Sequence, residues 1–454
     1  MTSAERLTDV LIIGGGCGAI AAAAALSKAA PALSSVIVEK SARVGLGIAY
    51  GTEIKHHILN VPAKVMGIYQ TDPEHFLKWG AQHEVKFGAE EFVSRQIFGE
   101  YLQHILANDI IATGHHSILQ SEIVSLSREG ELFYAQGANG EQIQARYVIL
   151  ATGHHSLQLP VKNIVGSIDE RLVQNPWGAA GYQNLGSIKR VAVLGAGLTA
   201  MDVVGGLDKR GYQGEIVLFS RRGLLPCPTA DSTSTTVVAF DQEVLTQPLR
   251  MLVSSIRARL LELSRAGDDW RLVIDSLRPH IAGLWRRFSE FERGQFMRHV
   301  RPYWDVARHR MPLEVHCRIE ELRLNGRLTI NRGRIGALDF SNASKIKLSW
   351  SRGGKSNSEE FDRVFNCAGS AALDARKLPP LLESLRKNGL IQLDRFGLGF
   401  HTSSSGELIG ERNTQVKRCF LIGPPRRASE WESTALREIR QQAYQVALQI
   451  AADR

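Results

Sequence analysis

Apolar runs and glycine-rich turns follow one another in the same order at two places in the chain. Residues 10–13 form an apolar run that leads into a glycine-rich turn, an alanine-rich stretch and a second apolar run at 36–38, which ends in Glu39. The same order begins again at residues 191–194 and ends with the apolar run 216–219. A strand, a glycine turn, a helix and a second strand are typical of a βαβ unit in a parallel sheet. The pattern therefore predicts two such units.

Both halves of the chain also close in the same way. Residues 147–150 and 363–366 are apolar runs that lead into turns of small residues, and each run follows a polar, glycine-bearing stretch typical of a hairpin. Repetition of a whole supersecondary pattern indicates a duplicated architecture. Two related nucleotide-binding units in one chain are the simplest interpretation.

Two further stretches have helical spacing. Between about 240 and 310, apolar residues recur at helical intervals among many arginines, and Pro248 stands where a helix can begin. We interpret this stretch as a helical insertion in the second unit. A final helix is predicted at about 432–451, after an apolar strand and the turn Gly423-Pro424.

The first glycine turn has the residues that a dinucleotide needs. Gly14 permits the tight turn, Gly16 lets a pyrophosphate approach the backbone, and Ala19 is small enough for the helix to pack closely on the strand. The phosphates then lie at the amino end of the helix, where free N–H groups and the helix dipole favour anions. Glu39, at the end of the second strand, can accept hydrogen bonds from ribose hydroxyl groups.

The second unit ends in two adjacent arginines instead of a carboxylate. A carboxylate repels the 2′-phosphate of NADPH, whereas guanidinium groups bind it. The first unit therefore suits FAD or NAD, and the second suits NADPH. The alternative is that the two arginines are ordinary solvated surface. The residues predicted to bind the cofactor in the second unit are Gly195, Gly197, Thr199, Ala200, Arg221 and Arg222.

These assignments predict an α/β fold with two Rossmann-like dinucleotide-binding domains, one for FAD and one for NADPH, and a helical insertion. The chain of 454 residues is long enough for two domains. The FAD-binding domain is expected in two parts, at 1–158 and 373–454. The NAD(P)H-binding domain is expected at 159–372, with the insertion at about 240–310.

Composition and charge narrow the range of partners. The chain has 55 lysine and arginine residues against 46 acidic ones, but none of the zinc-finger, RNP or KH patterns of nucleic-acid-binding proteins. Its five cysteines include no CxxC pair, which excludes a dithiol redox centre. The adjacent His154 and His155 lack a partner at metal-ligand spacing, so no metal site is predicted. No apolar stretch is long enough to span a bilayer, and we expect a cytoplasmic protein that binds neither nucleic acid nor membrane.

Several longer blocks of sequence are hard to produce by chance. They are Gly45-Leu46-Gly47, His57-Ile58-Leu59-Asn60-Val61-Pro62-Ala63, Asp72-Pro73, Phe98-Gly99-Glu100-Tyr101-Leu102, Arg301-Pro302-Tyr303-Trp304-Asp305, and Trp431-Glu432 with Thr434. In these blocks the chain resembles the bacterial FAD/NAD(P)-binding protein family, and the resemblance spans nearly its whole length. More distantly, the chain resembles the NADPH-dependent flavin N-hydroxylases, which share the two nucleotide units and the Ala-Thr-Gly turn at 151–153.

The resemblance to the hydroxylases implies a class B-like flavin monooxygenase. The loop 57–66 is then expected at the flavin ring, with Asn60 as a catalytic amide near its reactive edge. The turn Gly423-Pro424 is expected to place the amino end of the following helix at the flavin. The FxGxxxHxxx fingerprint of Baeyer–Villiger and flavin-containing monooxygenases is absent, which argues against those two subclasses. Further cofactor contacts that the resemblance implies are Lys40, Gly45, Gly47, Asn60, Val61, Thr152, Gly153, Gly423, Pro424, Glu432 and Thr434.

The predicted function is a FAD-dependent oxidoreductase that uses NADPH, with a monooxygenase acting on a small amine- or carboxylate-bearing substrate as the favoured form. Molecular oxygen is then a second substrate. Two alternatives remain open, namely a flavin oxidoreductase that inserts no oxygen and a flavin-binding regulatory partner without turnover. Arg310, together with Arg301 and Arg308, is a candidate for binding a substrate carboxylate, unless this helix face only packs and meets solvent. The sequence does not indicate the substrate or the oligomeric state.

Overall fold

The computed structural model describes residues 6–154, 159–230, 238–369 and 372–453. The chain divides into two compact units. Unit 1 comprises residues 1–51, 61–155 and 372–454, and unit 2 comprises residues 52–60 and 156–371. The chain therefore passes between the units at four points. The expected boundaries after residues 158 and 372 lie close to two of these points. Residues 52–60 also belong to unit 2, which no sequence pattern indicated.

Unit 1 is built on a mainly parallel sheet whose main path runs β16-β17-β6-β1-β2-β3. The predicted βαβ unit is present: strands β1 and β2 are parallel neighbours, and helix α1 connects them. Strand β16 at the edge pairs antiparallel with β17. The elements are β1 (Arg6–Ile13), α1 (Cys17–Ala29), β2 (Ser35–Glu39), β3 (His116–Gln120), β6 (Gln142–Leu150), β16 (Glu407–Ile409) and β17 (Gln415–Leu421).

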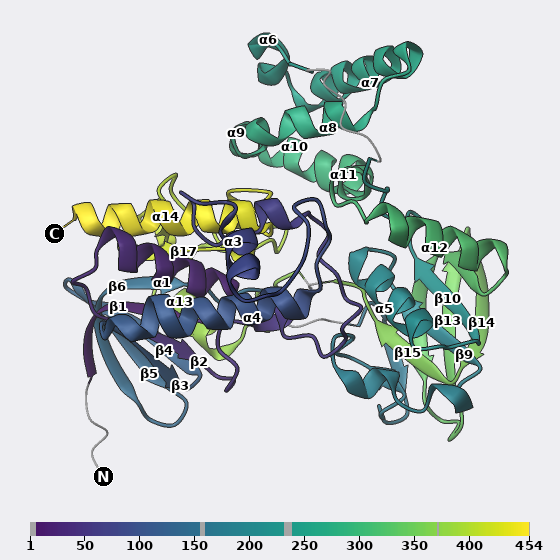
Figure 1. Ribbon diagram of the computed structural model, residues 1–454, viewed down its shortest axis with the longest axis horizontal. Helices are drawn as coiled ribbons and strands as arrows, with labels where there is room; N and C mark the ends of the chain where they lie inside the picture. Colours follow the sequence, from purple (N-terminus) through teal and green to yellow (C-terminus); the bar gives the residue numbers. More distant parts are fainter. Residues whose placement is uncertain (1–5, 155–158, 231–237, 370–371, 454) are drawn as a thin grey trace. The chain divides into compact units, whose positions relative to one another are not determined.

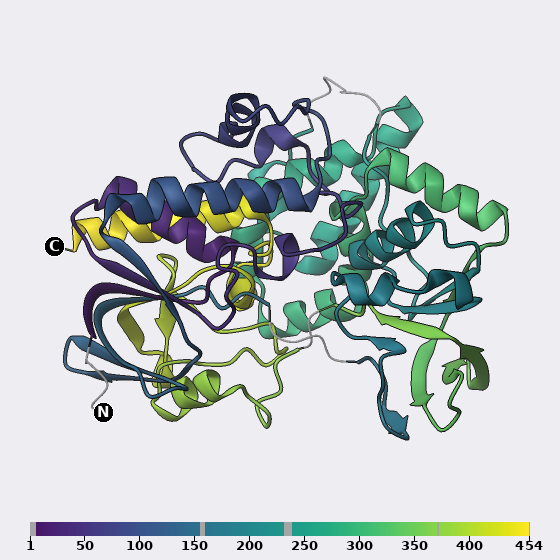
Figure 2. The ribbon, with the colours of Figure 1, turned by 60° about the horizontal axis from the view of Figure 1, so that its bottom comes forward.

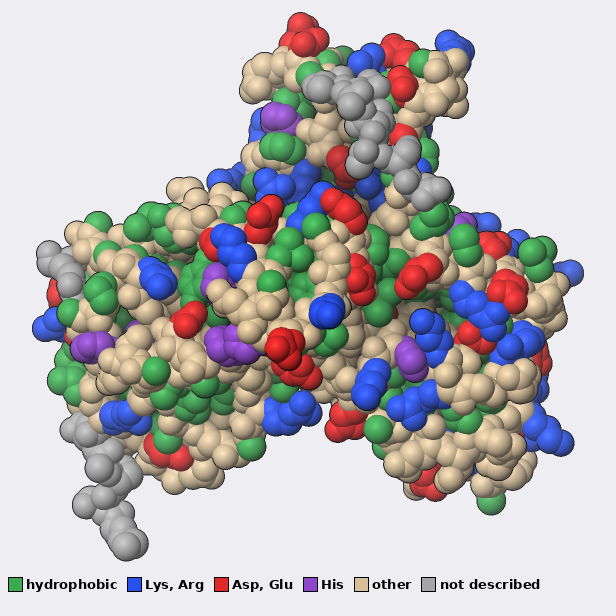
Figure 3. Space-filling model, viewed as in Figure 1, with side chains coloured by type: hydrophobic (Ala, Val, Ile, Leu, Met, Phe, Trp, Pro, Cys, Tyr) green, Lys and Arg blue, Asp and Glu red, His purple; other side chains and the backbone are tan. Residues whose placement is uncertain are grey.

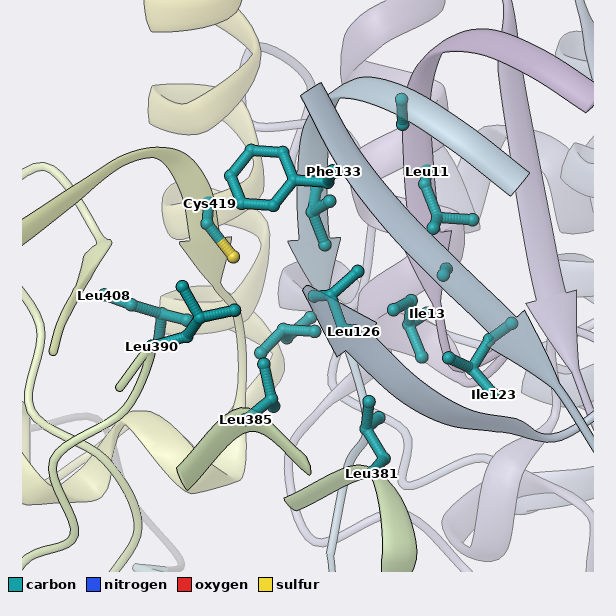
Figure 4. Packing of buried hydrophobic residues seen from close by; sticks show 14 of the residues in the cluster. Leu11, Ile13, Ile123, Leu126, Phe133, Leu381, Leu385, Leu390, Leu408 and Cys419 are labelled. Carbon is teal, nitrogen blue, oxygen red and sulfur yellow. The ribbon is translucent and has the colours of Figure 1, made fainter. Parts of the chain in front are cut away.

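The two faces of this sheet are covered differently. Figures 1 and 2 show helices α1, α4 (Arg95–Ile105) and α14 (Leu436–Ala452) together on one face. Helix α1 is rich in buried alanines, which let neighbouring backbones approach closely. A hairpin of β4 (Ile123–Glu129) and β5 (Leu132–Gly137), with helix α13 (Pro380–Lys387), encloses the main core on the other side. Figure 4 shows Leu126, Phe133 and Leu385 of these elements in one cluster with Leu11 and Ile13 of β1, with the ring of Phe133 directed toward Cys419 of β17.

Unit 2 repeats the arrangement on a smaller scale. Its parallel sheet has the order β11-β10-β9-β15-β8, and helix α5 joins β9 to β10. A separate sheet has the order β14-β13-β12-β7. The elements are β7 (Asn163–Val165), β8 (Leu172–Val173), β9 (Arg190–Leu194), α5 (Leu198–Lys209), β10 (Glu215–Ser220), α12 (Leu313–Leu324), β11 (Leu328–Arg332), β12 (Arg334–Asp339), β13 (Ile346–Arg352), β14 (Lys355–Phe361) and β15 (Arg363–Asn366).

The predicted helical insertion is present in unit 2 as a series of mostly short helices. Short helices leave many carbonyl groups without an intrahelical partner. The arginines supply those partners: Arg287 donates to the carbonyls of Leu245, Thr246 and Gln247 at the end of α6, and Arg293 donates to the carbonyl of Trp285 in α9. At least these two arginines of the insertion therefore close helix ends. The helices are α6 (Gln242–Thr246), α7 (Leu249–Ala266), α8 (Arg271–Leu277), α9 (Ile281–Arg287), α10 (Glu290–Gln295) and α11 (Arg301–Arg308).

The final helix begins later than the sequence pattern predicted. Residues Pro424–Ala428 form a 3-10 turn, and helix α14 starts only at Leu436. Gly423 and the two prolines after it favour a turn, and Gln442 of α14 donates to the side chains of Glu430 and Ser433 in the segment that follows. Ala435 has extended angles, φ −90° and ψ 144°, so the helix begins only after it. The predicted start at about residue 432 is therefore wrong by one helical turn.

Candidate dinucleotide-binding sites

The turn after β1 is fixed by contacts that only glycine permits. Gly14 has a φ of +102°, and a Cβ atom there would lie 2.5 Å from the carbonyl oxygen of Ala151. The N–H of Gly14 donates to the carbonyl of Val38 at 2.9 Å. The turn is thus held between strands β2 and β6, at the carboxyl ends of the strands, where nucleotides bind in open parallel sheets.

Gly16 is the N-cap of α1 and leaves open space above the helix. It has ordinary extended angles, φ −81° and ψ −170°, and no side chain caps the helix. A Cβ on Gly16 would have Gly47 as its nearest neighbour, with the Cα atom of Gly47 3.7 Å away. Within the described chain, the N–H groups of Cys17 and Gly18 meet no acceptor. Two glycines that face each other over free N–H groups make a cradle suited to a pyrophosphate.

The thiol of Cys17 adds no charge to this cradle. Burial raises its pKa to about 12, so the thiol stays neutral at physiological pH. No acidic side chain lies in the first turn of α1. The amino end of the helix therefore keeps the positive potential that favours an anion.

Glu39 is held against the same turn. Its Oε2 accepts a hydrogen bond from the N–H of Gly15 at 2.7 Å, and its Oε1 accepts one from the N–H of Ser41 at 2.9 Å. A Cβ on Gly15 would lie 2.5 Å from the Cβ of Glu39, so the two residues can approach only because position 15 is glycine. The neighbouring Lys40 is exposed and forms a 3.5 Å ion pair with Glu122.

A second loop supports the cradle. The N–H of Gly45 donates to the carbonyl of Gly15, and Gln103 of α4 donates to the carbonyl of Val44. Gly45 has a φ of +96°, and a Cβ there would meet the amide of Gln103 at 2.6 Å. Gln103 was not among the residues predicted from the sequence. Its position directly after the 98–102 block is the sequence feature that could have indicated it.

The turn after β6 also has the properties of a binding site. The hydroxyl oxygen of Thr152 is buried and has no hydrogen-bond partner among the described residues. Gly153 has a φ of +66° and open space beside it. An orphaned buried hydroxyl is costly unless a ligand satisfies it. Together with the cradle, it shows that the residues present fit a dinucleotide. The neighbouring His155 lies outside the described residues.

The loop that was expected at the flavin ring is split between the two units. Asn60 ends the segment 52–60 of unit 2, and Val61 begins the next segment of unit 1. Within unit 2 the segment is anchored by the buried side chains of Thr52 and His57: His57 is 2.8 Å from the hydroxyl of Thr52 and 3.3 Å from that of Tyr182. The placement of Asn60 relative to a flavin stays a prediction.

Residues 65–67 of the same loop are held inside unit 1. Arg440 of α14 donates to the carbonyl oxygens of Val65 at 3.1 Å and Gly67 at 2.7 Å. The side chain of Arg440 is buried, and both bonds come from its Nη1 nitrogen. The role of Arg440 as the anchor of this loop follows only from the structure.

The carboxyl-terminal turn corrects one expectation. The N–H of Gly423 donates to the side chain of Gln442 at 2.9 Å, and Pro424 has no N–H to offer. The helix amino end therefore does not follow Gly423-Pro424 directly but lies at Leu436, after Thr434. Glu432 is buried in the intervening loop. A role of this helix end at a flavin would act through residues 434–438 instead.

Unit 2 has a turn of the same geometry. Gly195 has a φ of +117°, and a Cβ there would lie 2.3 Å from the carbonyl oxygen of Cys367, as Gly14 meets Ala151 in unit 1. Gly197 has a φ of −84° and a ψ of −171°, within a few degrees of Gly16, and a Cβ atom there would meet nothing within 4 Å. Thr199 lies in the first turn of α5, and Ala200 is fully buried like Ala19.

The end of β10 carries positive charge in place of Glu39. Ser220 accepts a hydrogen bond from the N–H of Gly223 at 2.9 Å, which shapes the turn that holds Arg221 and Arg222. Both arginines are exposed. Arg222 donates to the carbonyl of Arg298 at 2.7 Å and lies over the ring of Tyr303. It is thus tied to the helical insertion.

Arg310 is engaged inside the insertion. Its guanidinium makes two 2.9 Å bonds to the carboxylate of Asp275, donates to the carbonyl of Ala307, and lies over the ring of Trp270. Only 13% of its side chain is exposed. These contacts favour a fold role over the substrate role considered from the sequence. On the visible face of the insertion in Figure 3, basic and acidic side chains are interspersed.

Other kinds of site find little support in the described chain. Its His, Cys, Asp and Glu residues form no group of three that could hold a metal ion. No helix within the described ranges has the length and apolar character needed to cross a membrane. A surface pocket of about 870 Å³ in unit 1 is lined by residues such as Gly80, Val85 and Phe87, and its lining includes no predicted site residue.

Comparison with known proteins agrees with this geometry. Residues 11–155 match a family model described as FAD-NAD(P)-binding, which confirms the predicted resemblance and the predicted class of cofactor. No curated protein sequence matches the chain significantly.

Solved structures match over nearly the whole chain. An ornithine N-hydroxylase from Kutzneria sp. 744, with reduced FAD, NADP+ and L-ornithine, has a TM-score of 0.66 at 14% identity, covering 99% of this chain and 100% of that one. The FAD-bound cadaverine monooxygenase of Erwinia amylovora has 0.68 at 13%, covering 99% and 95%. A bacillithiol disulfide reductase from Bacillus cereus has 0.58 at 15%, covering 99% and 100%. The fold is therefore that of two-domain dinucleotide-binding flavoproteins, and the predicted fold class is confirmed.

Proposed function

We propose that this chain is a FAD-dependent oxidoreductase that uses NADPH, with FAD bound by unit 1 and NADPH by unit 2. The observation that carries the proposal is the pair of turns with one backbone geometry and opposite charge at the end of the second strand. Glu39 suits the unmodified ribose of FAD, and the arginines after Ser220 suit the 2′-phosphate of NADPH.

The residues of unit 1 would hold FAD in defined ways. Gly16 and Gly47 leave the space for the pyrophosphate, and the N–H groups of Cys17 and Gly18 donate to it. Thr152 offers a buried hydroxyl that lacks a partner among the described residues. When bound, the flavin supplies hydride acceptance and reaction with oxygen, while the protein supplies binding, orientation and control of water.

For the reaction, we propose hydroxylation of a small amine. NADPH, a proton, oxygen and the amine would give NADP+, water and the hydroxylated amine. Two of the similar structures are named for acting on ornithine and cadaverine, which supports an amine as the substrate class. The second candidate is electron transfer without oxygen insertion, which the likeness to a bacillithiol disulfide reductase favours. A non-catalytic partner role is the third.

The cofactor assignment is tested by filling each cradle with one methyl group. Gly16→Ala and Gly197→Ala place a Cβ in open space at ordinary backbone angles, so both variants should fold like the wild type. We expect Gly16→Ala to lose FAD and Gly197→Ala to keep FAD but lose affinity for NADPH. Circular dichroism and FAD content separate binding from folding. Retention of both cofactors by both variants would refute the assignment.

The reaction is tested by its products. NADPH oxidation is followed with ornithine, lysine and cadaverine as trial substrates, while hydroxylated amine and hydrogen peroxide are measured together. Hydroxylated product that matches the NADPH consumed supports the monooxygenase. NADPH oxidation that yields only hydrogen peroxide with every amine, or that transfers electrons to a disulfide, supports the second candidate. Absence of any NADPH oxidation by FAD-loaded protein supports the partner role.

A further inference from the structure

Strand β11 lies beside β10, the strand that leads into Arg221 and Arg222. The two strands are parallel, and Ser220 at the end of β10 is in register with Arg332 at the end of β11. The side chains of residues in register on neighbouring strands lie on the same face of a sheet. Arg332 therefore lies on the face of the residue that occupies the place of Glu39.

Unit 1 has the same register with different residues. There Glu39 at the end of β2 is paired with Gln120 at the end of β3. The change from unit 1 to unit 2 is thus a double one, since a carboxylate becomes a hydroxyl and a neutral amide becomes a guanidinium. The first change removes a negative charge and the second adds a positive one, so both make this place more favourable for an anion.

The side chain of Arg332 lies beside the turn that holds Arg221 and Arg222. A Cβ atom on Gly223 would lie 3.6 Å from the Cβ of Arg332 and 4.0 Å from its Cγ, so the stem of Arg332 runs along that turn. Arg332 and Arg221 are exposed, and neither guanidinium has a hydrogen bond or ion pair with another residue that the structure describes. Arg222 differs because it donates to the carbonyl of Arg298 and packs on Tyr303.

We propose that Arg332 and Arg221 together hold the 2′-phosphate of NADPH, while Arg222 fastens the helical insertion to this edge of unit 2. The inference rests on the proposed function. A phosphate dianion is best held by two guanidinium groups that can each donate two parallel hydrogen bonds. Arg332, which no sequence motif singles out, becomes a specificity-determining residue for NADPH over NADH.

The test measures binding of the phosphate-bearing half of the cofactor, independent of turnover. FAD-loaded protein is titrated with 2′,5′-ADP and with 5′-AMP, which differ by the 2′-phosphate alone. Arg332→Gln copies the residue that unit 1 has at this register. It should weaken 2′,5′-ADP binding roughly ten- to one-hundred-fold and leave 5′-AMP binding unchanged, because a hydrogen bond to a charged group is lost. Arg332→Lys should recover part of the loss.

Arg334→Gln is the matched control, since Arg334 is an exposed arginine two positions along the chain in strand β12. It should bind both nucleotides like the wild type, and every variant should keep its FAD content. If Arg332→Gln binds 2′,5′-ADP as tightly as the wild type does, the role of Arg332 is refuted while the NADPH assignment stands. An equal loss in Arg334→Gln also refutes it, because the effect is then general surface charge. If the wild type itself does not prefer 2′,5′-ADP to 5′-AMP, the NADPH assignment fails, and this inference fails with it.

Discussion

The two nucleotide turns differ less in their backbones than in the residues at the neighbouring strand ends. Gly16 and Gly197 have the same angles within a few degrees, and Gly14 and Gly195 meet a carbonyl oxygen in the same way. At the end of the second strand, however, Glu39 stands in unit 1 and Ser220 in unit 2. The fold thus sets where a pyrophosphate can lie, and the strand ends set which ribose is accepted.

The hydrogen bond between Glu39 and Gly15 is a further difference between the nucleotide turns of the two units. In unit 1 the carboxylate accepts the N–H of residue 15, and the glycine there leaves room for it. In unit 2 the matching position is Ala196, and Ser220 bonds instead to Gly223. Selectivity therefore involves the turn itself as well as the strand end.

The largest effect is expected where the two units are alike. Gly14→Ala and Gly195→Ala each force a side chain to within 2.5 Å of a carbonyl oxygen, at a positive φ. The backbone strain alone costs roughly 1 to 3 kcal/mol, and the overlap adds to it. We expect Gly14→Ala to abolish FAD retention and Gly195→Ala to abolish 2′,5′-ADP binding. FAD content and nucleotide titration measure the two. Normal ligand binding in either variant would contradict the account of these turns.

A smaller and one-sided effect is expected at the next position. Gly15→Ala puts a Cβ 2.5 Å from the Cβ of Glu39, so the carboxylate must leave the N–H of residue 15. The lost charged hydrogen bond is worth about 1.5 to 3 kcal/mol, and FAD affinity should fall accordingly. Ala196→Gly is the control in unit 2 and should change 2′,5′-ADP affinity little. Equal effects in both units would show that the turns do not differ as described.

The sequence was sufficient for the parts of the molecule that local pattern governs. Both βαβ units and the insertion could be predicted, because periodic apolar residues and glycine turns are local signals. Contacts between distant segments could not. Arg332 pairs with Ser220 across more than a hundred residues, Arg440 anchors the loop at Val65 from the far end of the chain, and nothing local marks either.

The late start of α14 and the contacts of Arg310 have the same explanation. Helical spacing begins near residue 432, but Gln442 of α14 donates to the side chains of Glu430 and Ser433, and Ala435 has extended backbone angles. The sequence indicated that Arg310 could bind a substrate carboxylate. In the fold its guanidinium binds the carboxylate of Asp275, a contact that the sequence does not reveal.

The smallest effect concerns the pH dependence of the two units. Burial lowers the pKa of His116 in unit 1, where its ring meets the hydroxyls of Ser27 and Ser35. In the unfolded chain His116 has its ordinary pKa of 6.5, whereas in the folded chain its pKa is lower. Below pH 6.5 the unfolded chain therefore binds more protons than the folded chain, and the free energy of unfolding falls as the pH drops.

We therefore expect thermal release of FAD at a lower temperature at pH 5.5 than at pH 7.5, and a flatter dependence in His116→Gln. Asp208 of unit 2 has its pKa lowered by Arg318, and its contribution is lost only below the ordinary value of 3.8. Asp208→Asn should therefore leave the change between pH 7.5 and 5.5 as it is in the wild type. Thermal scans of flavin fluorescence at several pH values measure each curve, and identical curves for wild type and His116→Gln would argue against this origin.

The central claim is that the charge at the end of the second strand assigns FAD to unit 1 and NADPH to unit 2. Glu39→Arg reverses that charge in unit 1 alone, and FAD content and 2′,5′-ADP affinity are measured on the same purified sample. The wild type should hold roughly one FAD per chain. Glu39→Arg should lose nearly all of it with unchanged 2′,5′-ADP affinity, and Glu39→Gln, which keeps one side-chain acceptor, should lose less. A normal FAD content in Glu39→Arg would contradict the assignment.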